Sequence, residues 1–434
     1  MYDTIVSSVE QYKEQIASIL LMALTLSFMF TFEHLTDIVL VCSLLMTGLL
    51  YKRDASIRKI YQNLWHEGRI FFILIGLVGL GYLVSTLFTG MHRESFTVVR
   101  KTVQWMVYPM VLTFFLGSIS KRTETIIKVI VSGSIIFMCI NLLYQGLVLH
   151  INRPYEWVSH YYSNTSAGLI SCFLFLFFTK CFANTISYKL TTFIILVLSG
   201  GALAILKSRG ALVALGFAIV IMFIYGGISF VQRKKQWLLK ESYLLLLIGV
   251  IAIIFIPISS QDNMLLRSKD AVIGIQKVLV ESTPISEENQ WALRGGGDHV
   301  YLAESSIRMI KDHPVFGIGL DQFNRVYTQE GYIMPEAREP ELRSPHNIYL
   351  HVLVEAGLVG AIPMFLLWGY MLYYALKVIR EDNPYGIAFF LGLLTVFLHG
   401  IFDYAFLLRT EMQIVFFITS FILLNSVDDK EYNL

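Results

Sequence analysis

Residues 70–89 read IFFILIGLVGLGYLVSTLFT, without a single charged side chain. A helix needs about 20 mostly apolar residues to cross the hydrocarbon core of a bilayer, which is roughly 30 Å thick. The stretch therefore predicts one membrane-spanning helix, and the rest of the chain determines whether it stands alone.

Similar apolar runs recur along the whole chain, at 15–32, 35–51, 102–119, 124–149, 165–183, 190–206, 210–231, 238–258, 359–379, 385–402 and 410–425. Of the 434 residues, 55% are hydrophobic and 15% are charged, whereas soluble domains carry about 25% charge. The formal net charge of +2 does not suggest a nucleic-acid partner. The sequence thus predicts an all-α integral membrane protein with about 12 transmembrane helices in the lipid bilayer.

Basic residues indicate the orientation, because cytoplasmic loops are enriched in lysine and arginine. They concentrate in connections that follow even-numbered runs, the densest group being Lys52, Arg53, Arg58, Lys59 and Arg69. We expect both termini in the cytoplasm and a location in the cytoplasmic (inner) membrane. The predicted domains are a bundle of nine spans at 1–258, an extracytoplasmic catalytic loop at 259–358, and three spans with a cytoplasmic tail at 359–434.

The outer loop contains a predicted amphipathic helix. Asp298 suits its N-cap, and Pro314 ends it near His313. Apolar residues repeat at helical spacing on one face, namely Val300, Ala303, Ile307 and Ile310. The loop is therefore expected to be folded.

A second helix is predicted to open at Ser344, with Ser344 as N-cap and Pro345 in the first helical position. His346 and Asn347 would then lie in the first turn, where the helix dipole attracts anions and disfavours a second positive charge. A neutral His346 could accept a proton, and Asn347 beside it is a candidate substrate-binding residue. The alternative is a histidine that caps the helix or packs at the membrane surface.

Further along this helix, His351 and Glu355 are four residues apart and could pair. Gly357 could end the helix, with Leu358 starting the next span. Glu355 is a candidate substrate-binding residue, and the alternative is a simple interfacial salt bridge.

Arg209 lies in a very short connection between two apolar runs, so it must be close to the membrane surface. Its planar guanidinium suits phosphate oxygens, although it could instead reach the lipid headgroups. The outer loop adds further arginines as candidates for substrate binding, namely Arg294, Arg308 and Arg343.

Several catalytic motifs are absent from the sequence. It contains no GxxxxGK[ST] phosphate loop, no HExxH and no cluster with metal-ligand spacing. We therefore expect chemistry without a nucleotide, a metal or another cofactor.

Four segments resemble the O-antigen ligase and polymerase superfamily. They are DHPVFGIGLDQF at 312–323, SPHNIYL at 344–350 followed by EAGLVG at 355–360, SRGA at 208–211 and NTSA at 164–167. Their order and placement also match, over roughly residues 150–405. The family usually has an arginine about 15 residues before the proline, where this chain has His299, so Arg294 and Arg308 both remain candidates for that role.

The resemblance implies a fold like the C-type membrane glycosyltransferases. It also implies a metal-independent transfer of a glycan from undecaprenyl pyrophosphate to a sugar hydroxyl acceptor in surface polysaccharide assembly, alongside other polysaccharide-assembly proteins. Such a reaction needs cations against the pyrophosphate and a base for the hydroxyl. Arg209 and an outer-loop arginine would meet the first need, and His346 the second.

Two other classes remain as alternatives. A transporter or lipid-linked glycan flippase would be expected to carry ionisable residues in mid-span, and the predicted spans are nearly free of them. A cell-wall polymerase of the shape-and-division type has a related helix architecture, but its motifs are not apparent. The sequence leaves the choice between ligase and polymerase open.

Overall fold

A computed structural model describes residues 11–29, 33–118, 298–329, 331–333, 344–380 and 384–401, together with Ser8 and a few single positions between 140 and 221. All regular secondary structure among these residues is helical. The predicted all-α class is therefore confirmed for the described part of the chain. Three predicted spans (165–183, 238–258 and 410–425) and most of three others (124–149, 190–206 and 210–231) lie outside it.

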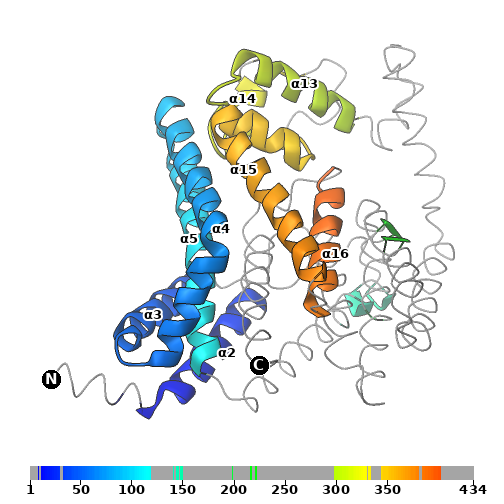
Figure 1. The fold of residues 1–434 in the computed structure, drawn as a ribbon. Helices are drawn as coiled ribbons and strands as arrows, with labels where there is room; N and C mark the ends of the chain where they lie inside the picture. Colours follow the sequence, from blue (N-terminus) through cyan, green and yellow to red (C-terminus); the bar gives the residue numbers. More distant parts are fainter. Residues whose placement is uncertain are drawn as a thin grey trace.

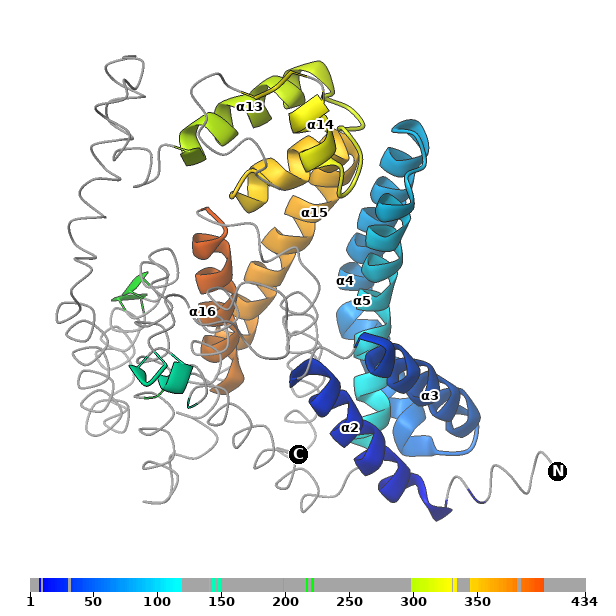
Figure 2. The same cartoon turned by 180° about the vertical axis from the view of Figure 1, so that it is seen from behind.

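Four helices come from the N-terminal part of the chain and form two hairpins (Figures 1 and 2). They are α2 (Lys13–Met29), α3 (Glu33–Tyr51), α4 (Ala55–Phe88) and α5 (Arg93–Ser118). Asp54 caps α4 by accepting a hydrogen bond from the backbone N–H of Ile57 (3.3 Å). Arg58 donates to the carbonyl of Tyr51 at the end of α3 (3.3 Å), so the turn between the hairpins is fixed from both sides.

Helix α4 is much longer than the span predicted at 70–89. It begins at Ala55 and runs for 34 residues, a length of about 51 Å at 1.5 Å per residue. Most of the basic connection between the second and third runs is thus helical. No proline interrupts residues 55–69, and the helix continues from the polar segment into the apolar one.

The other described helices come from the C-terminal half. α13 (Asp298–Asp312) matches the bounds of the predicted amphipathic helix to within one residue, and α14 (Phe323–Gln329) follows it. The predicted apolar face was wrong at Ile307, which is 45% exposed, because the helix packs through Leu302 and Met309 instead. Both lie at one end of the molecule, against the first part of α15 (Figure 1). One apolar cluster joins α13, α14 and α15, made by Leu302, Met309, Ile318, Phe323, Val326, Tyr327 and Val354.

Helix α15 (Ile348–Arg380) breaks at Gly357, whose backbone angles are φ 59° and ψ −168°. The break confirms the predicted end of the first, short helix at Gly357. α16 (Pro384–His399) runs back beside the longer part of α15.

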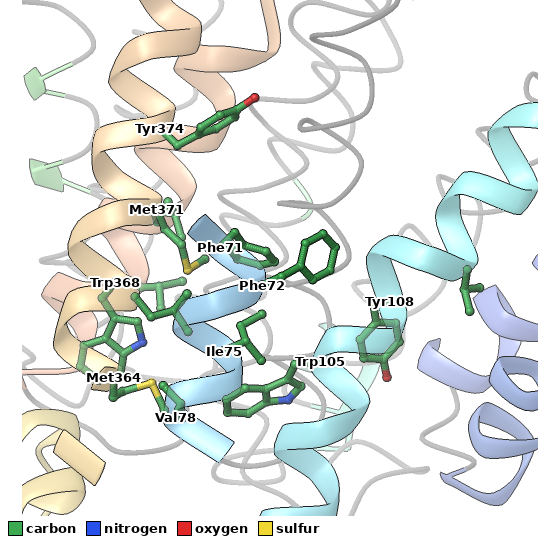
Figure 3. Packing of buried hydrophobic residues seen from close by; sticks show 14 of the residues in the cluster. Phe71, Phe72, Ile75, Val78, Trp105, Tyr108, Met364, Trp368, Met371 and Tyr374 are labelled. Atoms are coloured by element: carbon green, nitrogen blue, oxygen red, sulfur yellow. The ribbon is translucent and has the colours of Figure 1, made fainter. Parts of the chain in front are cut away.

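The core forms where α4 crosses α15 (Figure 3). Side chains on α4, among them Phe71, Ile75 and Val78, face Met364 and Trp368 on α15. Further along α4, a Cβ at Gly81 would lie 2.5 Å from the carbonyl oxygen of Val359 on α15. Small residues at such crossings allow the backbones of membrane helices to approach closely.

Two described helical segments, Ile57–Phe88 and Ile348–Arg380, are long and apolar enough to cross a membrane. Two shorter apolar segments, Asp37–Tyr51 and Phe390–His399, accompany them. Among the described residues, the spans predicted at 70–89 and 359–379 thus lie within the long segments.

Candidate functional site

Two of the motif segments meet at the break in α15. In an unbroken helix, the N–H groups of Leu358 and Val359 would bond to the carbonyls of residues 354 and 355. Here they donate instead to Pro314 (2.9 Å) and Val315 (3.1 Å). The carbonyls of residues 354 and 355, which the break releases, accept hydrogen bonds from residues that follow Val315 in the chain.

The acceptors are the carbonyls of Val354 and Glu355, which bond to the N–H groups of Ile318 (2.9 Å) and Gly319 (3.0 Å). We call residues 314–319 and 354–359 together the glycine junction. All four backbone groups released by the break find partners, so the break leaves no buried polar group unsatisfied at these positions.

The glycine junction requires glycine at two positions. Gly317 and Gly357 both have positive φ, of 72° and 59°, a region that L-residues with side chains rarely adopt. A Cβ on Gly317 would collide with the carbonyl of Glu355, and one on Gly357 with the carbonyl of Val315. Each motif therefore requires its glycine because the backbone of the other motif occupies the space that a side chain would need.

Two hydroxyl groups tie the α4–α5 hairpin to the glycine junction and the loop after it. Ser85 Oγ on α4 donates to the carbonyl of Phe316 (2.7 Å), and Ser95 Oγ on α5 donates to the carbonyl of Leu320 (2.7 Å). Both serines are fully buried. Sequence reasoning missed them, because a serine near the end of an apolar run has no distinguishing pattern.

Glu355 is buried beneath the loop that follows the glycine junction, with only 4% of its surface exposed. One carboxylate oxygen, Oε2, accepts the backbone N–H of Asp321 (2.8 Å) and lies 3.3 Å from Nε2 of His351. The predicted pairing of His351 with Glu355 is confirmed. Both side chains are largely buried, with 13% and 6% of their surface exposed.

The start of α15 differs from the prediction by three residues. Asn347, not Ser344, is the N-cap: its Oδ1 accepts from the N–H groups of Tyr349 and Leu350, both at 3.0 Å. Ser344 Oγ instead accepts from the N–H of His346 (3.4 Å). The placement of His346 in the first helical turn was therefore wrong, since His346 precedes the cap.

His346 has a positive φ of 48°, which is uncommon for a residue with a side chain and often marks a functional position. Its side chain is half-buried. The residues after it are attached to the end of α16: Ile348 N–H donates to the Gly400 carbonyl (2.7 Å) and Asn347 Nδ2 to the Ile401 carbonyl (3.0 Å). The backbone is thus held at a fixed point while the imidazole keeps access to the surface.

The predicted arginines divide into two groups. Arg209, Arg294 and Arg343 lie outside the described residues. Arg308 lies on the exposed face of α13 and pairs with Glu304 (2.9 Å).

A cation that was not among the predicted binding residues, Arg325 on α14, lies near the end of the α4–α5 hairpin. Its guanidinium contacts the His92 ring (Nη2 to Nε2, 3.2 Å) and donates from Nε to Gln322 (2.8 Å). In the described parts of the chain, no group of three or more His, Cys, Asp or Glu side chains could hold a metal ion.

Comparison with known proteins gives two matches. The family described as O-antigen ligase matches residues 194–365. An uncharacterized protein of Haemophilus influenzae is 24% identical over 268 residues, covering 60% of this chain. The chain spans 62% of the length of that relative.

The family match contains the whole glycine junction, His346 and the capping residue Asn347. It excludes α4 and α5, which supply Ser85 and Ser95. The resemblance read from the sequence is thereby confirmed: residues 194–365 match the family described as O-antigen ligase.

Proposed function

We propose that the protein transfers a glycan from undecaprenyl pyrophosphate to a sugar hydroxyl, at the outer face of the cytoplasmic membrane, during surface polysaccharide assembly. The observation that carries the proposal is the position of His346 within the O-antigen ligase family region: a half-buried imidazole on a backbone fixed by α15 and α16. A base held in this way suits the removal of a proton from an acceptor.

In the proposed reaction, the acceptor oxygen attacks the anomeric carbon of the donor sugar. The bond between that carbon and the pyrophosphate oxygen breaks, and the pyrophosphate leaves on its lipid. His346 takes the hydroxyl proton. Arg209, with Arg294, Arg308 or Arg343, would stabilise the negative charge that develops on the leaving group. No nucleotide, metal or other cofactor enters the proposed reaction.

Asn347 and Glu355 were predicted to bind substrate, and their contacts favour a positioning role. Asn347 caps α15 and donates to the Ile401 carbonyl, and the Glu355 carboxylate accepts from Asp321 and lies beside His351. These contacts support a role in holding His346 and the 317–321 loop in place.

The proposed topology has about 12 spans, both termini in the cytoplasm and residues 259–358 outside. Helix α4 supports this arrangement: Arg58, Lys59 and Arg69 lie in its first half, and Ser85 contacts the glycine junction at its other end. Cysteine substitution at Glu288 tests the orientation. An impermeant thiol reagent should label it from outside, and labelling only after the cytoplasm is opened would reverse the topology.

The function is tested with purified protein in liposomes, supplied with an undecaprenyl-pyrophosphate-linked oligosaccharide and an acceptor. The wild type should form the glycan product, and His346→Ala should lower the rate by about 10²–10⁴ if His346 acts as a general base. His313→Ala, at the exposed end of α13, is the matched control. A folded wild type that moves the donor across the bilayer without product would favour a flippase.

The acceptor distinguishes the two forms of the proposal. A ligase uses a lipid A core, whereas a polymerase uses a second lipid-linked repeat. Offering each acceptor separately, and measuring the mass of the product, decides between them.

A further inference from the structure

A groove of about 780 Å³ lies between α3 and α4, at the end of the molecule away from α13 and α14 (Figure 1). One wall is a single face of α3, made by Leu44, Thr47, Gly48 and Tyr51. The other is a single face of α4, made by Tyr61, Gln62, Trp65, His66 and Arg69, with Lys52 at the turn between them. The groove is thus mostly apolar along α3 and aromatic and basic along α4, with Lys52 at the turn and Arg69 at the other end of the α4 wall.

Two cations at this groove have no side-chain partner among the residues that the structure describes. Among the described residues, Lys52 and Arg69 have no side-chain hydrogen bond or ion pair, although both line the groove and are exposed. Nearby Arg58, in contrast, donates to the backbone at the end of α3. The basic side chains at the groove are therefore available to a ligand.

The neighbouring carboxylates are already engaged. Asp54 pairs with Lys13 (2.5 Å), and Glu67 pairs with Lys377 (3.2 Å) and lies 3.8 Å from the exposed His66. Among the described residues that line the groove, none is acidic. Its charge is therefore positive, and an anionic ligand is the complementary one.

The depth of the groove matches a membrane surface. Trp65 precedes Ser85 by 20 residues on α4, which corresponds to about 30 Å along the axis and equals the thickness of a bilayer core. Aromatic rings such as Tyr61 and the exposed Trp65 are enriched at this level. Trp65 would lie at the level of the lipid headgroups, and the long side chains of Lys52 and Arg69 would extend to the same level.

We propose that this groove binds an anionic glycerophospholipid of the leaflet opposite the glycine junction. Lys52 and Arg69 contact the phosphate, and one acyl chain lies along Leu44 and Gly48. Basic pockets between membrane helices bind anionic headgroups by the same chemistry. The site is separate from the proposed glycan transfer, and its test does not depend on that activity.

The first test removes the two charges. The full chain in mild detergent is titrated with phosphatidylglycerol or phosphatidylcholine of identical acyl chains, and bound lipid is counted by native mass spectrometry. The wild type should prefer phosphatidylglycerol. The double variant Lys52→Gln/Arg69→Gln should bind it about 30-fold more weakly and lose the preference.

The matched control is Arg53→Gln/Lys59→Gln, which removes the same charge from the same end but from residues outside the groove. It should bind phosphatidylglycerol like the wild type. An equal loss in both double variants, or no loss in either, would overturn the proposal, because attraction would then not depend on the groove.

The second test fills the groove and leaves its charge intact. A Cβ on Gly48 meets nothing within 4 Å, and leucine favours a helix more than glycine does, so Gly48→Leu should fold. It should lose phosphatidylglycerol binding to at least the extent of the charge variant. Gly79→Leu on α4, also open at its Cβ but outside the groove, should bind normally. Normal binding by Gly48→Leu would exclude this path for the acyl chain.

Discussion

The two ends of α4 are held in different ways. At the glycine junction, backbone groups bond to backbone groups, and Gly317 and Gly357 lie so close to other backbone atoms that no side chain fits. At the end near α3, side chains form ion pairs, Lys13 with Asp54 and Lys377 with Glu67. Backbone bonding fixes positions closely but tolerates few substitutions, whereas a partly exposed ion pair such as Glu67–Lys377 tolerates many and fixes little. The difference predicts a gradient of mutational effects along one helix.

The largest effect is expected at Gly357. Gly357→Ala places a methyl group against the Val315 carbonyl and keeps a positive φ, so we expect a loss of more than about 2 kcal/mol in stability. Thermal unfolding followed by size-exclusion chromatography measures it. Gly369→Ala, in the same helix with open space at its Cβ, should be neutral or slightly stabilising. Equal effects would mean that the junction is not the constraint.

The next effect is expected at Glu355. Glu355→Leu leaves the Asp321 N–H without its acceptor and His351 without its carboxylate, at a cost of about 1–3 kcal/mol. Glu355→Gln keeps an acceptor and should recover part of the stability. Glu304→Gln removes an exposed pair on α13 and should cost less than about 0.5 kcal/mol. Thermal unfolding should show the lowest stability for Glu355→Leu, a higher one for Glu355→Gln and the highest for the control Glu304→Gln.

A smaller effect is expected at Ser85. Ser85→Ala removes the hydrogen bond to the Phe316 carbonyl, worth about 1 kcal/mol. Hydrogen exchange should rise in residues 314–319. Thr97→Ala on α5, whose hydroxyl bonds only within its own helix (3.2 Å to Arg93), should leave that exchange unchanged. No change in exchange for Ser85→Ala would show that the hydroxyl does not hold the segment.

The smallest effect is expected for the ion pair of Glu67 and Lys377. Their side chains are 26% and 37% exposed, so a double-mutant cycle with glutamine at both positions should give a coupling below about 1 kcal/mol. The coupling should fall further in high salt. A coupling of several kcal/mol that salt leaves unchanged would place both ends of α4 under equal constraint.

The features that the sequence predicted correctly are local ones. The bounds of α13 follow from a capping aspartate and a terminating proline, and the boundary at Gly357 follows from a glycine between two helical patterns. The pair His351–Glu355 follows from their spacing of four residues. Each depends on residues within one or two turns, so the pattern is visible without the fold.

The features that escaped prediction depend on distant partners. The glycine junction joins segments about 40 residues apart through backbone atoms, which every residue except proline carries alike. Ser344 and Asn347 are both good capping residues. Asn347, which is the cap, also donates a hydrogen bond to the carbonyl of Ile401, a contact that the local sequence does not reveal. The extension of α4 was missed because charged residues suggest a loop in a membrane protein, although they are compatible with a helix outside the bilayer.

The bonds of Ser85, Ser95 and Asn347 also define the smallest unit that could fold around His346. Two of these bonds start on α4 and α5, and the third ends at Ile401. Ser85, Ser95 and Ile401 all lie outside residues 194–365, whereas the groups that they bind lie inside. A protein cut down to the family region would lose hydrogen-bond partners on both sides of the imidazole, so exchange of that region between relatives should succeed only when the matching hairpin and the end of α16 are transferred with it.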